Sequence, residues 1–223
     1  IGDLDGDGRA DLVIGNQDAL ADGAHVIFGS AINSGATIST DVLDGSNGFS
    51  ITREQAGDGL GAAVTVGDFN SGSSDDILLG AGALDVGGQV NVGAAYLVEG
   101  GTTLSFTGGD LALGVSERDF IGSSANDGLG LSVANVGDVD GDGVVDLGLT
   151  TSSDQTTIFY GQNTAKNDPG IGIGLTPLAG LSPGEGRTIS PGGGSNEFVN
   201  GTVAAAGDVN GDGFDDFTIS VLK

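Results

Sequence analysis

One aspartate-rich phrase occurs four times in this chain at nearly constant spacing. The copies begin at Asp3, Asp68, Asp138 and Asp208, so successive starts lie 65, 70 and 70 residues apart. A fixed period of this length is typical of a repeat architecture, in which each repeat is one supersecondary unit stacked on its neighbours. In the third copy, Gly-Asp-Val-Asp-Gly-Asp-Gly-Val-Val-Asp at 137–146, three aspartates stand at alternate positions. Their mutual repulsion predicts a partner that neutralises them.

Short apolar segments flank each copy at similar offsets and are bounded by glycine. They contain many β-branched residues and show no helical period, which is typical of buried strands. The expected strands are 62–67, 131–137 and 202–207 before the copies, 11–15, 76–80, 146–150 and 216–220 directly after them, and 25–29, 95–100, 157–161, 48–52, 119–122 and 187–190 later in the repeats. About four strands per repeat predict an all-β fold made of β-propeller blades, each with four antiparallel strands.

Composition agrees with many short strands and tight turns. Glycine contributes 45 of 223 residues without a Gly-X-Y period, so a collagen-like chain is excluded. The chain contains no cysteine, which excludes disulfides and thiolate metal sites. No stretch of 18 apolar residues occurs, so membrane insertion is not expected.

Acidic residues outnumber basic residues by 31 to 6, which gives a formal net charge of −25. A polyanion of this size is not expected to bind nucleic acid or an anionic membrane unless cations bridge the two. The acids cluster in the repeated phrases rather than in one tail. The charge pattern therefore predicts cation binding.

The four nine-residue copies, 3–11, 68–76, 138–146 and 208–216, are numbered here as loops one to four. Side chains at positions 1, 3, 5 and 9, together with the backbone carbonyl of position 7, can turn toward one ion. All these donors are oxygens, and Ca²⁺ takes six to eight oxygens at about 2.3–2.6 Å. Gly at position 6 permits the sharp turn. The expected ligands are Asp3, Asp5, Asp7, Arg9, Asp11, Asp138, Asp140, Asp142, Val144, Asp146, Asp208, Asn210, Asp212, Phe214 and Asp216.

An EF-hand is the closest alternative, because its calcium loop begins in almost the same way. That loop has twelve residues, ends on a bidentate Glu and lies between helices. Position 12 here is Ile14, Leu79, Leu149 or Ile219, and the expected flanks are strands. The ligand ring must therefore close at position 9.

Loop two departs from the pattern. It keeps Asp68, Asn70 and Asp76 in register but has Gly72 at position 5 and Ser73 where the other loops have Gly. We expect a weak or empty site there and about three Ca²⁺ sites in the chain.

The order of small-residue strand, Asp loop, apolar strand and aromatic-Gly ending resembles the FG-GAP repeat of integrin α-chain propellers and bacterial secreted proteins. Residues 130–138 are similar to the family phrase G-x-S-V-A-x-x-G-D, 200–204 give a weaker version, Ile27-Phe28-Gly29 supplies the aromatic-Gly ending, and 43–49 look like the strand and turn that precede bacterial copies.

The resemblance implies that each cation loop joins the first and second strands of a blade. It implies complete blades at 56–125 and 126–196 and partial ones at 1–55 and 197–223. Family propellers usually have seven blades, so we expect an arc of a larger propeller. A small ring closed by a shared terminal blade is the alternative.

The resemblance implies an extracellular or cell-surface module for adhesion or for protein or glycan recognition, in which calcium is structural. Loops 30–47, 81–94 and 162–186 are the expected contact surface. A purely architectural spacer, or a non-catalytic propeller attached to a secreted hydrolase or lyase, remains an alternative. We predict no enzymatic activity, because His25 is the only histidine and no nucleophile elbow, P-loop or HExxH motif occurs.

Overall fold

Nearly all regular secondary structure in the described residues is β-strand. The computed structural model describes residues 1–16, 23–32, 37–52, 55–101, 110–113, 120–152, 155–161, 176–177, 184–190 and 201–220. Regular structure in these ranges is β-strand, apart from the short 3-10 helices η1 (Gly29–Ala31) and η2 (Thr40–Val42). The predicted all-β class is confirmed. No helix in this part of the chain has the length and apolar character that crossing a membrane requires.

Four sheets follow one another along the chain. The first contains β1 (Leu12–Asn16), β2 (Gly23–Ile27), β3 (Gly48–Thr52) and β7 (Asp110–Ala112). The second contains β4 (Ala63–Gly67), β5 (Asp76–Ala81), β6 (Ala94–Val98), β8 (Phe120–Ile121) and β12 (Thr176–Pro177). The third contains β9 (Ser132–Gly137), β10 (Asp146–Thr150), β11 (Thr156–Phe159) and β13 (Gly186–Ile189), and the fourth is the hairpin of β14 (Val203–Gly207) and β15 (Asp216–Ile219).

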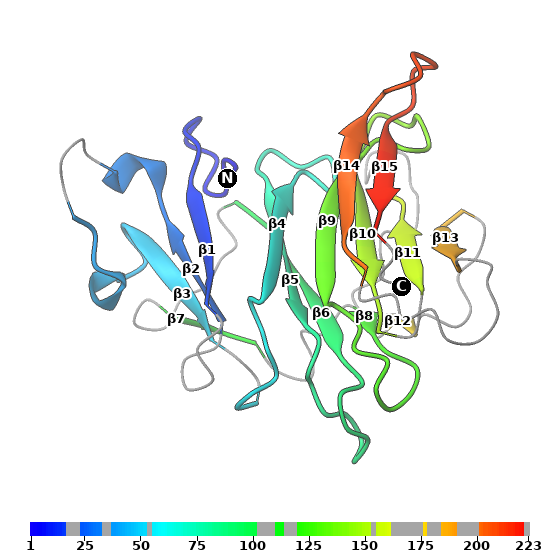
Figure 1. Ribbon diagram of the computed structural model, residues 1–223. Coiled ribbons are helices and arrows are strands. Elements are labelled where there is room, and N and C mark those ends of the chain that lie inside the picture. Colours follow the sequence, from blue (N-terminus) through cyan, green and yellow to red (C-terminus); the bar gives the residue numbers. More distant parts are fainter. Residues whose placement is uncertain are drawn as a thin grey trace.

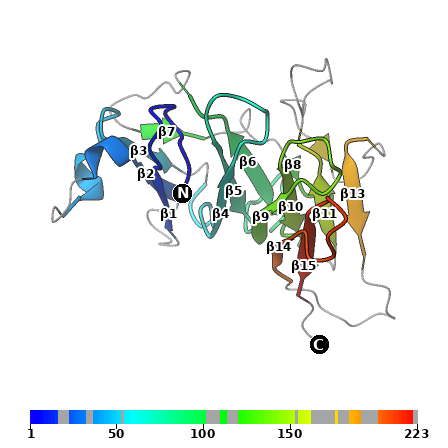
Figure 2. The same ribbon diagram turned by 90° about the horizontal axis from the view of Figure 1, so that it is seen from above.

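The sheets lie side by side in chain order (Figure 1, Figure 2). The same Gly–Asp pair closes the Asp loops at their mouths. Gly67 pairs with Asp76, Gly137 with Asp146 and Gly207 with Asp216, each at the mouth of one Asp loop. In the first sheet an isolated bridge between Gly2 and Asp11 holds the same place. The sequence repeat is thus a repeat of one loop closure, although next to it the third and fourth sheets have a register shift that the second lacks.

In the described residues, the second and third sheets each contain four antiparallel strands from a single repeat, β4, β5, β6 and β8 in the second and β9, β10, β11 and β13 in the third. β7, which lies within the predicted blade 56–125, pairs in parallel with β3 of the first sheet. β12, within the predicted blade 126–196, pairs in parallel with β8 of the second sheet. An edge strand offers unpaired backbone groups, and here the following repeat pairs with them. The sheets therefore exchange short strands across the predicted blade boundaries.

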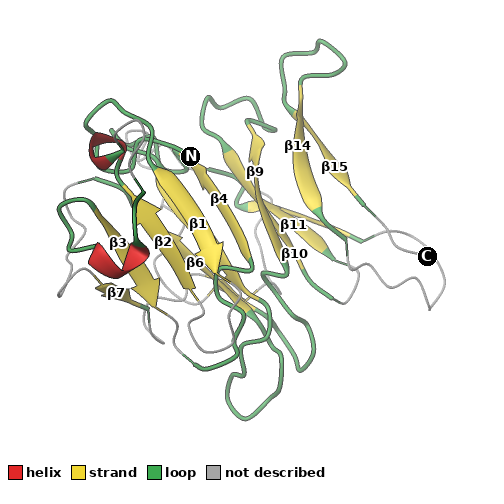
Figure 3. Ribbon diagram, turned by 60° about the vertical axis from the view of Figure 1, so that its left-hand side comes forward, coloured by secondary structure: helices red, strands yellow, loops and turns green. Residues whose placement is uncertain are grey.

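The apolar core lies between successive sheets. Leu79 and Tyr96 of the second sheet are fully buried against Phe49 of the first, and the Phe120 and Phe159 rings, 4.4 Å apart between centroids, join the second sheet to the third. The cluster at the fourth sheet is the smallest and includes Val203. Figure 3 shows the β14–β15 hairpin at one end of the row. The central sheets are therefore packed on both faces, which fixes the loops at their ends.

Candidate metal centres in the repeated loops

Loops two, three and four connect the first and second strands of their sheets, β4–β5, β9–β10 and β14–β15. In loop three, Gly143 at position 6 has a φ of 93°, as the sharp turn predicted for this position requires, and Gly141 at position 4 has a φ of 81°. Loops one and four have glycines with positive φ at the same two positions. The need for glycine at position 4 was not predicted, although Gly6, Gly141 and Gly211 repeat there in the sequence.

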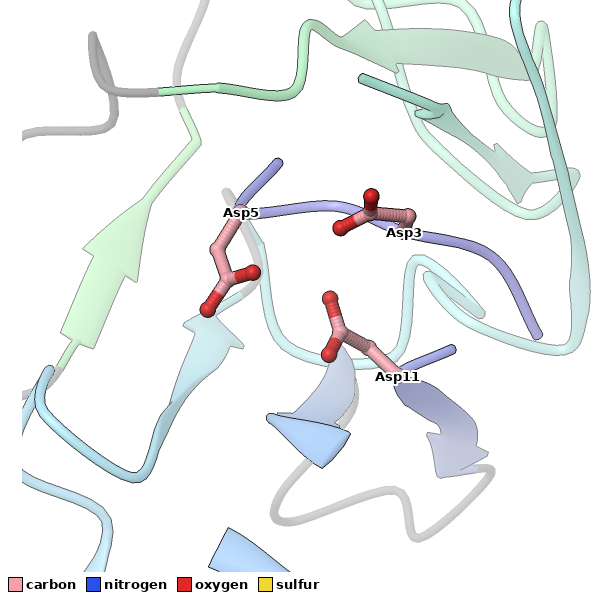
Figure 4. Close-up of side chains that lie close together, drawn as sticks. All are labelled: Asp3, Asp5 and Asp11. Atoms are coloured by element: carbon pink, nitrogen blue, oxygen red, sulfur yellow. The ribbon is translucent and has the colours of Figure 1, made fainter. Parts of the chain in front are cut away.

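Three carboxylates converge in loop one. Asp3, Asp5 and Asp11 each offer an oxygen, and these oxygens all lie within 4.8 Å of one another. Figure 4 shows the three side chains pointing toward a common centre. Loop three repeats the arrangement with Asp138, Asp140 and Asp146. Each triad could hold a metal ion through positions 1, 3 and 9 of its loop.

The position-9 carboxylate is buried and ties the loop to the end of the third strand. Asp146 is 0% exposed and accepts hydrogen bonds from the amides of Val139 (2.8 Å) and Gly161 (2.7 Å). Asp11 does the same with the amides of Leu4 (2.8 Å) and Gly29 (2.7 Å). The buried carboxylate thus joins two segments of one sheet.

Burial also changes the protonation of this carboxylate. Desolvation, with the nearby charges of Asp140 and Asp138, raises the pKa of Asp146 to about 7 against the opposing effect of its two backbone hydrogen bonds. Desolvation likewise raises the pKa of Asp11 above its usual range. A bound cation would act in the opposite direction, because it favours the charged carboxylate.

The position-1 carboxylate organises the turn. Asp138 accepts hydrogen bonds from the amides of Gly141 (2.7 Å), Asp142 (3.0 Å) and Gly143 (2.9 Å). Asp208 accepts the same three bonds in loop four, and the amides of that loop lower its pKa, with Gly213 the largest cause. The backbone therefore wraps around one carboxylate and points its donors at it.

The position-5 aspartates, which were predicted ligands, bond the backbone of the turn through one carboxylate oxygen. Asp142 accepts a hydrogen bond from the amide of Val144 at 2.8 Å, and Asp7 accepts one from the amide of Arg9 at 2.8 Å. Neither aspartate belongs to the close triads. The position-7 residues, whose carbonyls were predicted ligands, differ in burial, since Val144 is buried while Arg9 and Phe214 are exposed. The structure thus brings together positions 1, 3 and 9, and position 5 braces the turn.

Loop four has the backbone pattern of loop three with one amide in the ring. The Asn210 side-chain oxygen accepts from the Asp212 amide at 2.9 Å, as Asp140 accepts from the Asp142 amide at 3.2 Å. The Asp212 carboxylate accepts from the Phe214 amide at 3.0 Å. At position 9, Asp216 accepts from the Val209 amide at 3.0 Å. Loop four therefore presents two carboxylates and an amide at positions 1, 3 and 9.

In loop two, a side-chain amide contributes to the contacts of the position-9 carboxylate. The Asn70 amide nitrogen donates to Asp76 at 3.3 Å, and the amides of Phe69 (3.1 Å) and Gly100 (3.0 Å) complete the contacts of this buried carboxylate. Burial raises its pKa to about 6. Position 4 is Ser71 with a φ of 55°, and position 6 lacks the positive φ of the other loops. A side-chain donor thus faces the position-9 carboxylate.

Neighbouring loops are linked through position 8. Asp75 of loop two accepts from the Asp3 amide at 2.8 Å and donates its own amide to the Asp3 carbonyl at 2.8 Å. Asp215 of loop four forms the same pair with Asp138 of loop three, at 3.0 and 2.8 Å. Between loops two and three, the Val145 side chain lies against Gly67 instead. Position 8 had no predicted role, although its acids recur at 75 and 215.

A second repeated Asp motif was also missed. Asp58 and Asp127 open the phrase Asp-Gly-Leu-Gly shortly before β4 and β9, at the strand ends opposite the cation loops. Asp58 accepts from the amides of Gln55 and Leu60, and Asp127 accepts from Ser123 and Ser124. Both carboxylates are buried. The first strand is therefore anchored at each end by an acid.

The remaining predicted features lie apart from the loops. His25 is half-buried in β2 with its Nδ1 3.0 Å from the Ser50 hydroxyl. Of the predicted contact surface, 81–94 is fully described, 33–36 falls outside the described residues, and so does 162–186 except for 176–177 and 184–186.

No protein-family model and no curated protein matches the chain. The resemblance to the FG-GAP repeat therefore remains a prediction from the residues quoted above, and the function is inferred from the loops and sheets themselves.

Proposed function

We propose that the chain is a calcium-binding arc of an FG-GAP-type β-propeller that serves as a non-enzymatic adhesion or recognition module outside the cell. The observation that carries this proposal is the repeated carboxylate triad of loops one and three. Successive sheets that lie side by side, with Asp loops closed by the same Gly–Asp pair, support the propeller arrangement.

The donor set fits Ca²⁺. Every side chain at positions 1, 3 and 9 offers oxygen, and carboxylates predominate, as hard divalent cations require. The ion neutralises carboxylates that would otherwise repel at short range, and it bridges the turn to the buried residue that holds the end of the third strand. Since only the folded chain brings these positions together, binding stabilises the fold.

An extracellular location follows from the strength expected of such sites. Calcium sites of extracellular modules have dissociation constants of roughly 10⁻⁴–10⁻³ M, so they fill where calcium is abundant. A chain with a net charge of −25 also remains strongly hydrated there after a few ions bind.

The partner would be a protein or a glycan bound by the loops that differ between repeats, such as 81–94. An architectural spacer is the second candidate, favoured by the backbone clamps through Asp75 and Asp215, which connect neighbouring loops into a stiff row. A glycan and matrix-protein binding screen separates the two, because a spacer binds nothing with or without calcium.

Calcium titration by calorimetry tests the metal centres. We expect a stoichiometry near three, with loops one, three and four occupied, and a calcium-dependent rise in melting temperature. Mg²⁺ at equal concentration is the control and should give less heat, since it accepts such flexible oxygen cages poorly. Absence of heat, together with a melting temperature insensitive to chelator, would contradict the proposal.

A further inference from the structure

Position 3 of the repeated loops carries an amide in two copies and a carboxylate in the other two. Loops one and three have aspartate there, whereas loop two has Asn70 and loop four has Asn210. Asn70 is followed by Ser71, but Asn210 is followed by Gly211. An Asn-Gly pair is chemically reactive, because glycine has no Cβ and its backbone nitrogen can approach the preceding side-chain carbonyl carbon with little hindrance. Loop four therefore places a reactive pair inside a candidate metal centre.

A second Asn-Gly pair in the described residues has a much more restrained environment. Asn47 is half-buried, its Oδ1 accepts the Asp44 amide at 3.1 Å, and its Nδ2 donates to the Val42 carbonyl at 2.9 Å. Gly48 is buried in β3, where a Cβ would fall on the Val26 carbonyl oxygen. The fold thus fixes both the side chain and the backbone nitrogen of this pair.

The pair in loop four is exposed at both residues. The Asn210 Oδ1 accepts the Asp212 amide at 2.9 Å, and the Gly211 amide donates to Asp208 at 2.7 Å. Exposure is a property of this place in the loop, since the equivalent two residues of loop three are exposed as well. Two exposed hydrogen bonds therefore hold the reacting groups, and bonds of this kind open at low free energy.

We propose that Asn210 is a site of spontaneous deamidation, which gives loop four the third carboxylate that loops one and three already have. The Gly211 nitrogen forms a bond to Cγ of Asn210. The Cγ–Nδ2 bond breaks, and the side-chain nitrogen leaves as ammonia with the proton of the Gly211 amide. Water then opens the cyclic imide. Attack at Cγ yields an aspartyl residue, and attack at the backbone carbonyl carbon yields an isoaspartyl residue.

The closed loop restrains this reaction. For the ring to form, the Gly211 nitrogen must leave Asp208 and approach the side chain of Asn210. Calcium held by Asp208, Asn210 and Asp216 keeps the loop closed, because it binds only the arrangement in which these groups converge. Deamidation therefore proceeds from the opened loop of the metal-free protein.

The two products have opposite effects on loop four. The aspartyl product restores Asp-Val-Asp-Gly-Asp-Gly, the sequence of loop three at positions 1 to 6, and an added charge tightens a site built of oxygen ligands. The isoaspartyl product adds a methylene to the backbone between positions 3 and 4 and so displaces the Gly211 amide from Asp208. These consequences rest on the proposed calcium binding, whereas the modification itself does not.

Peptide mapping by mass spectrometry follows the reaction in the 223-residue chain, incubated with chelator at mildly alkaline pH. We expect Asn210 to gain the mass difference between an amide and an acid about tenfold faster than Asn47. In denaturant the difference should disappear, because unfolding exposes both pairs. Equal rates in the folded chain, or an Asn210 that stays unmodified while the denatured chain reacts, would overturn the proposal.

A matched variant assigns the mass gain to one residue. Asn210→Gln keeps an amide at position 3, but its longer side chain would have to close a larger ring, so this variant should lose the rapid mass gain while Asn47 is unaffected. Fragment ions separate Asn210 from the Asn-Gly pair at 200–201, which lies close in sequence. A rapid gain that persists in Asn210→Gln would place the reaction elsewhere and contradict the proposal.

A calcium arm distinguishes this proposal from the proposed function. Calcium at about ten times the dissociation constant of loop four should slow the modification of Asn210 about tenfold and leave Asn47 unchanged. A rate that calcium does not alter would count against metal binding by loop four, while the modification site stands. Asn210→Asp should bind calcium in loop four about tenfold more tightly than the original chain, as calorimetry measures, and equal affinity would refute the stated consequence of deamidation.

Discussion

Loops two and three differ in the side chain that faces the buried carboxylate at position 9. Both have nine residues, the same closing Gly–Asp pair and a buried aspartate at position 9 that accepts two equivalent backbone amides. In loop three, Asp140 at position 3 adds a further negative charge beside Asp146, whereas in loop two Asn70 donates its amide to Asp76. A side-chain amide in loop two thus faces the position-9 carboxylate at the place that we propose for a cation in loop three.

The largest expected difference concerns removal of the position-9 carboxylate. Asp146→Ala and Asp76→Ala each leave two buried amides without an acceptor, at about 1–3 kcal/mol per group. In calcium we therefore expect both to lower the free energy of unfolding by about 2–5 kcal/mol. Only Asp146→Ala should also reduce the calcium stoichiometry by one. Denaturant titration and calorimetry measure the two effects, and loss of a calcium equivalent in Asp76→Ala would remove the distinction between the loops.

The second-largest effect is expected when loop two is changed toward the sequence of loop three. The double variant Asn70→Asp/Gly72→Asp replaces the amide donor with a charge and gives position 5 a carboxylate like that of Asp142. We expect a lower melting temperature without calcium, a larger calcium-induced rise and one added equivalent in calorimetry. Asn70→Ala/Gly72→Ala is the control and should not gain an equivalent. An unchanged stoichiometry would mean that the backbone conformation at Ser71 and Ser73 keeps the introduced carboxylates from binding a cation.

The pH dependence follows from the raised pKa values of Asp146, about 7, and Asp76, about 6. Because burial raises both above their ordinary value, the calcium-free folded chain holds these protons more tightly than the unfolded chain. Its free energy of unfolding should therefore fall as pH rises from about 4 toward about 7. Calcium should stabilise more at high pH, where it no longer competes with protons. Melting curves of metal-free protein test the sign, and a steady rise in stability over this range would contradict it.

The smallest change in stability is expected for substitutions at position 7 of the loops. The Ser74 hydroxyl is buried without a hydrogen-bond partner in the described structure, whereas loop three has the buried apolar Val144 at this position. Ser74→Val should stabilise by about 1 kcal/mol, because it removes an unsatisfied hydroxyl and adds apolar contact. Val144→Ser is the reciprocal variant and should destabilise. Chemical denaturation without calcium compares them, and destabilisation by Ser74→Val would indicate that Val is too large beside Gly6 and Gly101.

The sequence was informative wherever a local rule acts. Period, flanking apolar runs and glycine positions predicted the hairpins, and the alternation of acids predicted that positions 1 and 9 would meet. The parallel pairing of β7 with β3 was not predictable, because it joins residues some 60 positions apart, with three strands of the second sheet between them in the sequence. Nor did the pattern reveal that Asp142 would bond the Val144 amide rather than join the close triad.

Position 8 alternates along the chain between an apolar residue and an aspartate. This alternation affects the expected cooperativity of calcium binding. Asp75 fixes the backbone of Asp3, and Asp215 fixes that of Asp138, so both hydrogen-bonded clamps act on a residue that would itself hold calcium. At the boundary between loops two and three the link is made by Asn135 instead, whose side chain donates to the Val66 carbonyl at 3.2 Å and accepts from the Gly137 amide at 3.0 Å. Calcium bound in loop three should therefore change the calcium affinity of loop four, and calcium bound in loop one should stabilise the backbone of loop two. A calcium titration of such a chain would report coupling between loops three and four, while loop one would bind calcium without a calcium-binding neighbour across its clamp.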